Sequence, residues 1–174
     1  MILIHPVPAC RPWLLAAALL CGPGAGQAAE TATAFQAMTG IHAVALQLEG
    51  IEDDYSAHGL VRPELERLLV ARLAGAGLEV IPPGNWLDRQ DSVLLTLRLR
   101  LNRAPYYFFL YNINLAMHSA VTLASNPGAS FATIMTWSDG WVGDMQPTEL
   151  AQVREFATLL VDRFLAEYHV QNGG

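Results

Sequence analysis

Residues 92–101 (SVLLTLRLRL) largely alternate between apolar and other side chains, and this pattern constrains the fold more than any other feature of the chain. Every odd position from 93 to 99 is Val or Leu, whereas Arg98 and Arg100 occupy even positions. Successive side chains of a β-strand point to opposite faces of its sheet, so a slip of one residue would move both arginines into the core. The segment therefore predicts a strand that buries one face.

A second strand is predicted to follow after a five-residue hairpin loop, Asn102–Tyr106, which pairs Leu101 with Tyr107. The run Tyr106–Tyr111 is apolar or aromatic at six consecutive positions, so something must cover both faces of this strand. In the predicted register, the odd positions from 109 to 117 join the core face of the first strand. The even face carries both arginines, Phe108 and Leu110, followed by Asn112, Asn114 and His118.

The even, outer face of these strands has two interpretations. The arginine stems and guanidinium planes can lie over Phe108 within the chain. Alternatively, the face is a contact patch, because aromatic residues and Arg are enriched in interface cores and large exposed apolar patches mark interaction sites. The predicted partner-binding residues are Arg98, Arg100, Tyr106, Phe108 and Leu110.

The remaining segments indicate the fold class. Pro63 opens a helix with leucines at helical spacing, and glycines at 75 and 77 end it. The order β-α-β-β-β-β-α predicts an α+β fold: a two-layer α/β sandwich with a mainly antiparallel sheet of about five strands and both helices on one face. The predicted elements of this single domain, residues 41–170, are strands at 41–49, 78–81, 92–101, 107–124 and from 130 onward, with helices from 63 and at 147–168.

The amino terminus indicates export. The apolar run at residues 13–21 is too short for a membrane span, which needs about 20 residues. The small residues of GPGAGQAA follow it, as is typical of a secretory signal peptide. We therefore expect residues 1–28 to be removed near Ala28, a periplasmic location and no stable membrane anchor.

Two further expectations concern lipidation at Cys21 and the residues that follow the signal peptide. Leu20 precedes Cys21, where a lipidated cysteine is normally preceded by Gly, Ala or Ser, so lipidation is disfavoured. Residues 29–40 are predicted to be a flexible lead-in. If its apolar residues Phe35 and Met38 fold over the outer face, that face is covered within the chain.

Charge and cysteine content exclude several classes of protein. The net charge is −6 and all ten cations are Arg, which disfavours nucleic-acid binding, and the absence of Lys excludes Schiff-base chemistry and a Gly-Lys phosphate loop. Cys10 and Cys21 both lie in the predicted signal peptide, so the exported chain has no disulfide, thiol nucleophile or cysteine zinc site. With no catalytic motif such as G-x-S-x-G or H-E-x-x-H present, we predict neither an enzyme nor a cofactor.

Two segments contain residue types that could form a binding site. Glu49–Asp54 supplies oxygen ligands suited to calcium or magnesium, but it lacks the spacing of a calcium loop and is interpreted as a solvated turn, so no metal site is predicted. Trp137 and Trp141 flank an Asp-Gly pair, which is above all a turn signal between β-prone residues. The alternative is a glycan or small-molecule site that joins both tryptophans to Asn112 and Asn114.

Four segments carry a resemblance: GLVRPELERLLVARLAGAGLEVI, RAPYYFFLYNINLAMHSAVTLASNP, ATIMTWSDGWVG and the closing amphipathic helix. Together they resemble a family of small, signal-bearing bacterial proteins of unknown function. The chain departs from that family in lacking Lys and in its aromatic run Tyr106–Tyr111. The resemblance implies a periplasmic location and an α/β sandwich, and it implies no activity.

We therefore predict a non-enzymatic periplasmic binding or assembly module. Its partner is expected to be a protein of the cell envelope or a second copy of the chain, contacted through the aromatic and arginine residues of the outer sheet face. The alternative is a periplasmic small-molecule or glycan binder.

Overall fold

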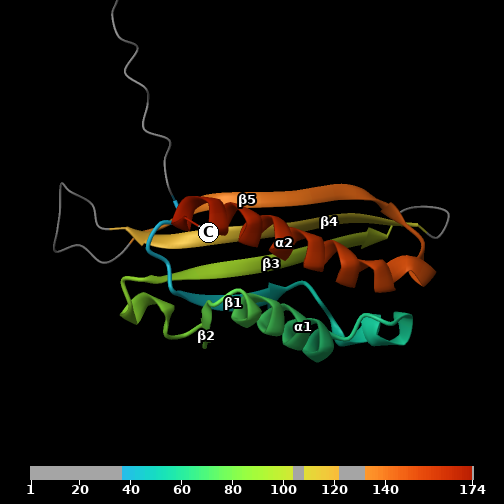
Figure 1. Ribbon diagram of the computed structural model, residues 1–174. Helices are drawn as coiled ribbons and strands as arrows, with labels where there is room; N and C mark the ends of the chain where they lie inside the picture. The colour runs from blue at the N-terminus through green and yellow to red at the C-terminus, as the bar shows by residue number, and fades with distance from the viewer. Residues whose placement is uncertain (1–36, 104–107, 122–131, 174) are drawn as a thin grey trace, which may run out of the picture. The chain divides into compact units, whose positions relative to one another are not determined.

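The computed structural model describes residues 37–103, 108–121 and 132–173 (Figure 1). Its described part contains a five-stranded sheet, two α-helices and short 3-10 helices. The strands are β1 (Ala43–Glu49), β2 (Glu79–Ile81), β3 (Ser92–Arg103), β4 (Phe109–Val121) and β5 (Ala132–Met145). The helices are α1 (Arg62–Gly75) and α2 (Val153–Asn172), with 3-10 helices η1 (Asp53–His58), η2 (Trp86–Asp88) and η4 (Pro147–Gln152).

The sheet is mixed, with the strand order β2-β1-β3-β4-β5. β1 pairs in parallel with both β2 and β3, while the three longest strands, β3, β4 and β5, are antiparallel. Its two edges differ in length, since β2 has 3 residues and β5 has 14.

The two helices cover one face of this sheet, and both lie in front of it in Figure 1. In α1, Pro63 stands in the first turn, where a missing N–H costs nothing, and Leu65, Leu69 and Leu73 are buried at a spacing of four residues. A capping box between Gln146 and Glu149 starts the helical segment η4, which leads into α2. The core is formed by these helices together with Leu95, Leu97, Leu99, Ile113, Leu115, Met117 and their neighbours.

The predicted fold class is confirmed. The element order β-α-β-β-β-β-α and the two-layer arrangement with both helices on one face are those expected from the periodicities. The even positions of β3 and β4 form the outer face, away from the helices, because the odd positions belong to the core.

The predicted register of the β3–β4 hairpin is wrong by four residues. Leu101 pairs with Tyr111 instead of Tyr107, and the last pair is Arg103 with Phe109. Because four is an even number, every side chain keeps its predicted face. Its neighbours change, however: Arg98 and Arg100 lie opposite Asn114 and Asn112 and not beside Phe108.

The predicted turn at Asp139–Gly140 is also wrong, because β5 runs straight through it. Gly140 lies opposite Asn114, and a Cβ there would come within 2.5 Å of the carbonyl oxygen of Ile113. The glycine therefore permits a close approach of two strand backbones, which is the second common role of glycine in strands.

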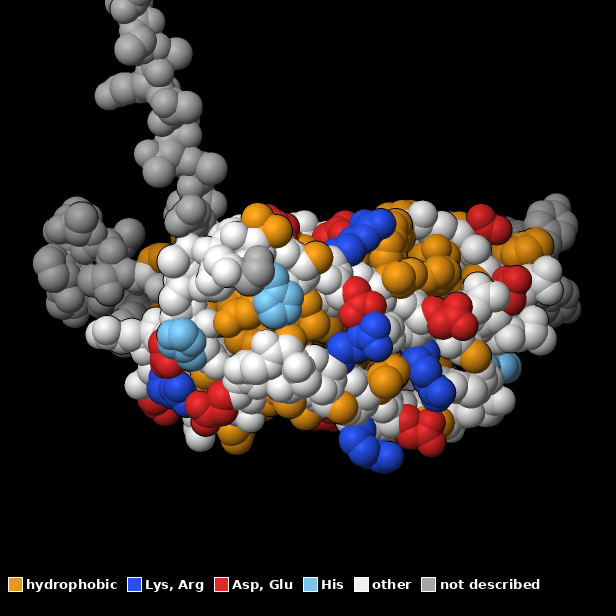
Figure 2. Space-filling view, viewed as in Figure 1, with side chains coloured by type: hydrophobic (Ala, Val, Ile, Leu, Met, Phe, Trp, Pro, Cys, Tyr) orange, Lys and Arg blue, Asp and Glu red, His pale blue; other side chains and the backbone are white. Residues whose placement is uncertain are grey.

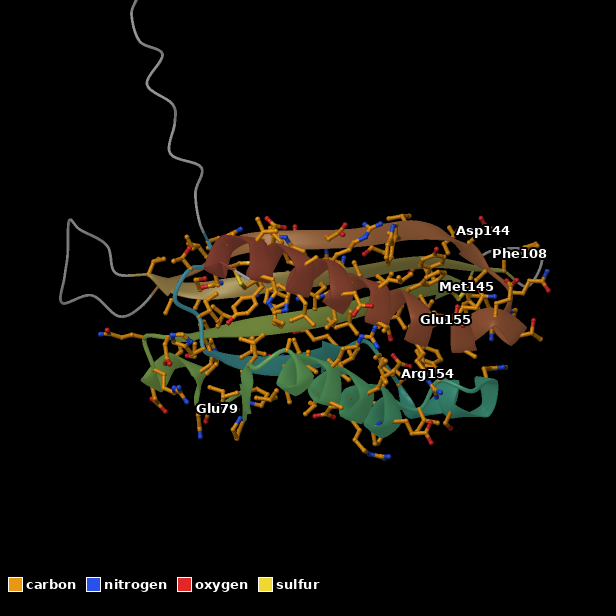
Figure 3. All side chains as sticks on the ribbon, in the orientation of Figure 1. Glu79, Phe108, Asp144, Met145, Arg154 and Glu155 are labelled. Atoms are coloured by element: carbon orange, nitrogen blue, oxygen red, sulfur yellow. The ribbon has the colours of Figure 1, made fainter. Side chains whose placement is uncertain are left out.

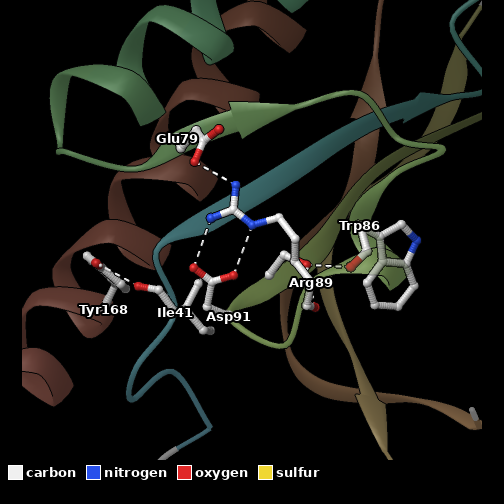
Figure 4. A network of polar contacts seen from close by, with 7 residues as sticks. Ile41, Glu79, Trp86, Arg89, Asp91 and Tyr168 are labelled. Atoms are coloured by element: carbon white, nitrogen blue, oxygen red, sulfur yellow. Dashed lines mark hydrogen bonds and ion pairs between the residues drawn. The ribbon is translucent and has the colours of Figure 1, made fainter.

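One end of the outer face is covered by the η2 segment. Ala43 and Ala45 of β1 point away from the core yet are fully buried, and the buried Trp86 lies in η2, which contacts β1 and β3. The guanidinium of Arg89, which follows η2, donates hydrogen bonds to Asp91 (2.9 and 3.0 Å) and to Glu79 (2.6 Å), as Figure 4 shows. These contacts hold the η2 segment in place. The hydrogen bond from Arg89 holds the pKa of Asp91 below its ordinary value.

Candidate functional site

The uncovered half of the outer face lies near the β3–β4 hairpin, and we call it the open face. β3, β4 and β5 contribute one residue each to every row of this surface. Its rows are Asn102–Leu110–Asp144, Arg100–Asn112–Val142 and Arg98–Asn114–Gly140.

The open face exposes two apolar side chains beside Asn112, and we call this pair, Leu110 and Val142, the apolar centre. Leu110 is 52% exposed and Val142 is 75% exposed, and the two belong to adjacent rows of neighbouring strands. Phe108, which is 37% exposed, precedes β4 and lies at the same end of the sheet as Asp144 (Figure 3). Exposed apolar side chains in a group, and not singly, indicate a contact surface.

Opposite charges flank this apolar centre. Arg100 lies on the β3 side and Asp144 on the β5 side, and within the described part of the chain neither forms an ion pair. Arg98, in contrast, donates a hydrogen bond of 2.6 Å to Glu49 of β1 and is neutralised there. Asn114 donates to the carbonyl oxygen of Asp139 at 3.0 Å, which holds β4 and β5 together at Gly140.

The side chains of the alternative ligand site are divided between the two faces of the sheet. Trp137 and Trp141 pair with Met117 and Ile113 and therefore lie on the helix-covered face, whereas Asn112 and Asn114 lie on the outer face. Trp137 contacts Phe164 edge-on with ring centroids 5.5 Å apart. Both indoles pack on α2, whereas Asn112 and Asn114 line an open hollow together with Gly140, Trp141 and Val142, and Trp137 does not belong to it.

Polar contacts fix both tryptophans against α2. The Trp137 Nε1 donates to Glu167 at 2.6 Å, and the Arg163 guanidinium lies 4.7 Å from the ring centroid of Trp141. Arg163 also donates to Asp139 at 2.8 Å, and this hydrogen bond is the main cause that lowers the pKa of Asp139.

Replacing Arg163 with leucine is expected to cost about 1 to 2 kcal/mol at pH 7, because the partly exposed ion pair and the cation–π contact each contribute up to about 1 kcal/mol. The depressed pKa of Asp139 means that the ionic part is present above the unfolded pKa and is lost as the pH falls through the folded pKa. The urea midpoints of the variant and of the unmodified chain, measured from pH 7 to pH 2, should therefore partly converge in acid.

Arg154→Leu is the control, since Arg154 pairs with Glu64 and makes no cation–π contact in the described residues. Equal losses of stability in the two variants would contradict the cation–π contribution.

The start of the described chain does not cover the open face. Met38 is fully buried in the core on the helix side. Its amide donates to the side chain of Gln171 and its carbonyl accepts from Asn172, each at 2.9 Å. Residues 37–40 of the predicted lead-in are thus held at the end of α2, while Phe35 lies outside the described residues, as does Tyr106 of the predicted partner-binding set.

The helix-bearing side differs from the open face in its charge pattern. Figure 2 shows acidic and basic side chains adjacent to one another over the helices. Arg72 of α1 pairs with Asp162 of α2 at 2.6 Å, and Arg154 of α2 pairs with Glu64 of α1 at 3.0 Å. These four charges are paired with one another, whereas Arg100 and Asp144 on the other side form no ion pair with any described residue.

The described residues contain neither a candidate metal site nor a candidate membrane-spanning helix. No group of three or more His, Cys, Asp or Glu side chains in residues 37–103, 108–121 and 132–173 is placed to hold a metal ion. No helix in the same ranges has the length and apolar character of a membrane span.

Comparison with known proteins gives distant structural similarity alone. No protein-family model and no curated protein matches the chain. A PelC dodecamer from Paraburkholderia phytofirmans is 17% identical, with 73% of this chain and 87% of that chain covered and a TM-score of 0.38. A minor lipoprotein from Acinetobacter baumannii is 13% identical, with 75% and 92% covered and a TM-score of 0.27. Such TM-scores are too low to support an inference about function or assembly.

The β5 residues of the open face, Val142 and Asp144, are not predicted from the sequence. The Asp-Gly pair before them is a turn signal and indicates the end of the strand. Continued alternation was the available signal: Trp137, Asp139 and Trp141 point to the helices, and Ser138, Gly140 and Val142 to the other side.

Proposed function

We propose that this chain is a non-enzymatic binding or assembly module of the periplasm that contacts a protein partner through the open face. The observation that carries the proposal is the exposed pair Leu110 and Val142 on a sheet face that no helix of the described residues covers. Burial of an apolar side chain contributes about 1.5 to 3 kcal/mol, so two adjacent ones supply a useful part of a binding energy. The periplasmic location follows from the predicted signal peptide at residues 1–28.

Leu110→Thr combined with Val142→Thr is expected to abolish association while changing the free energy of unfolding by no more than about 0.5 kcal/mol, because both sites are on the surface and Thr keeps strand propensity. The chain from residue 29, labelled at its amino terminus, is followed by fluorescence-detected sedimentation, alone and in an envelope extract.

The matched control places the same loss of apolar surface on the other side of the molecule. Leu159 and Val170 of α2 are 50% and 79% exposed, and replacing both with Gln keeps helix propensity. The control should sediment like the unmodified chain. If the Thr variant does so as well, in buffer and in extract, the open face is not the contact surface.

A further inference from the structure

We infer that the partner is a second copy of this chain, and that two copies pack open face to open face about a two-fold axis running along β4. This inference rests on the proposed function and names the occupant of its surface. The argument comes from the positions of the unpaired charges relative to the apolar centre.

The charges of the open face are divided between its two sides. Arg100 lies on β3, Leu110 and Asn112 lie on β4, and Asp144 lies on β5. A cation and an anion, both free of ion pairs among the described residues, thus stand on opposite sides of β4, which presents Leu110 and Asn112 between them. Such a surface is complementary to itself, as an isologous interface requires.

Rotation about an axis along β4 exchanges the two sides. The β3 side of one copy then faces the β5 side of the other, and β4 faces itself. Arg100 comes to lie over Val142 of the second copy, one row from Asp144, a displacement of about 7 Å along the strands that an arginine side chain spans. Asn102 lies over Asp144 of the second copy and can donate to it.

The other two-fold arrangement is disfavoured. An axis in the face but perpendicular to the strands places β3 over β3 of the second copy. Arg100 then lies over β3 of the second copy and Asp144 lies over β5, so neither charge meets an opposite one. The axis along β4 brings Arg100 near Asp144 of the second copy, and charge complementarity therefore favours that axis.

The apolar centre agrees with this axis. Leu110 faces Leu110 of the second copy, with Val142 beside it, so the exposed apolar surface of both copies is removed from water. The ion pairs stay at the rim of the contact, where they determine orientation more than affinity.

Charge reversal followed by mixing tests the arrangement. Arg100→Glu and Asp144→Arg each create two like-charge contacts per dimer, and each is expected to weaken self-association at least about tenfold. In a mixture of the two variants, the new glutamate at position 100 meets the new arginine at position 144, and the unchanged Asp144 meets the unchanged Arg100. The mixture should therefore regain the association of the unmodified chain in sedimentation velocity.

A cross-link provides a measurement that does not depend on charge. The chain from residue 29 contains no cysteine, and packed sheets lie about 10 Å apart. A bis-maleimide of roughly that span should therefore join two copies of an Asn112→Cys variant, whereas Leu159→Cys on α2 should stay uncoupled.

The outcomes separate this inference from the proposed function. Weakening without recovery on mixing, or no weakening at all, overturns the two-fold arrangement. An unmodified chain that is monomeric in buffer but associates in envelope extract overturns the second copy as partner and leaves the open face as the contact surface. Loss of association in the Leu110 and Val142 variant tests that surface independently.

Discussion

A Gly50→Ala variant is expected to lose about 3 to 5 kcal/mol of unfolding free energy, the sum of backbone strain and steric overlap. Gly50 follows β1 and has a φ of +73°, a conformation that L-residues rarely adopt. A Cβ at this position would overlap the carbonyl oxygen of Leu99 in the buried strand β3. Because that oxygen belongs to the backbone of a central strand, it cannot move aside without disturbing the sheet.

Gly40→Ala separates the two causes. Gly40 has nearly the same φ, +76°, but no atom lies within 4 Å of the position its Cβ would take. It should lose only the conformational part, on the order of 1 kcal/mol. Urea unfolding of both variants measures the difference, and equal losses would show that the contact with Leu99 has no energetic consequence.

A Phe164→Ala variant is expected to lose about 3 to 5 kcal/mol, which is the usual cost of removing a buried aromatic side chain. Phe164 is fully buried in α2 and is among the largest side chains of the core. Its ring contacts Trp137 edge-on and stacks with Tyr168 at a centroid distance of 6.4 Å. The cavity left by the missing ring would thus remove packing contacts with both Trp137 of β5 and Tyr168 near the end of α2.

Thermal unfolding with near-ultraviolet circular dichroism tests this expectation, since Trp137 reports on the loss of packing. Leu159→Ala is the matched control, because Leu159 lies on the same helix and is half exposed, and its cost should be small by comparison. A similar loss in both variants would mean that α2 packs against the sheet less tightly than its buried residues indicate.

Local periodicity was sufficient to predict the face of the sheet on which most side chains lie. Val93, Leu95, Leu97 and Leu99 turned to the core, and Arg98, Arg100, Leu110, Asn112 and Asn114 turned away from it, as expected. The reason is that a strand has a side-chain period of two and needs one buried face, and both conditions can be read within ten residues.

The cross-strand neighbours of these side chains could not be predicted from local periodicity. A shift of four residues in the β3–β4 hairpin left every face unchanged but gave Arg100 the neighbour Asn112 in place of Phe108. Local alternation is satisfied by any even shift, and the observed one depends on how long strands pair over their whole length. The face was therefore predictable, while the composition of the site was not.

The amino-acid sequence by itself determined the α+β class, the element order and the two faces of the sheet, because these depend on the local spacing of apolar side chains. The tertiary structure alone decided that β5 continues through Asp139–Gly140, that the tryptophans pack under α2, and that Val142 lies across β4 from Arg100. Each of these depends on backbones and side chains distant in the chain approaching one another closely. Asp-Gly becomes part of a strand when a neighbouring backbone, here that of Ile113, occupies the space that a Cβ would need.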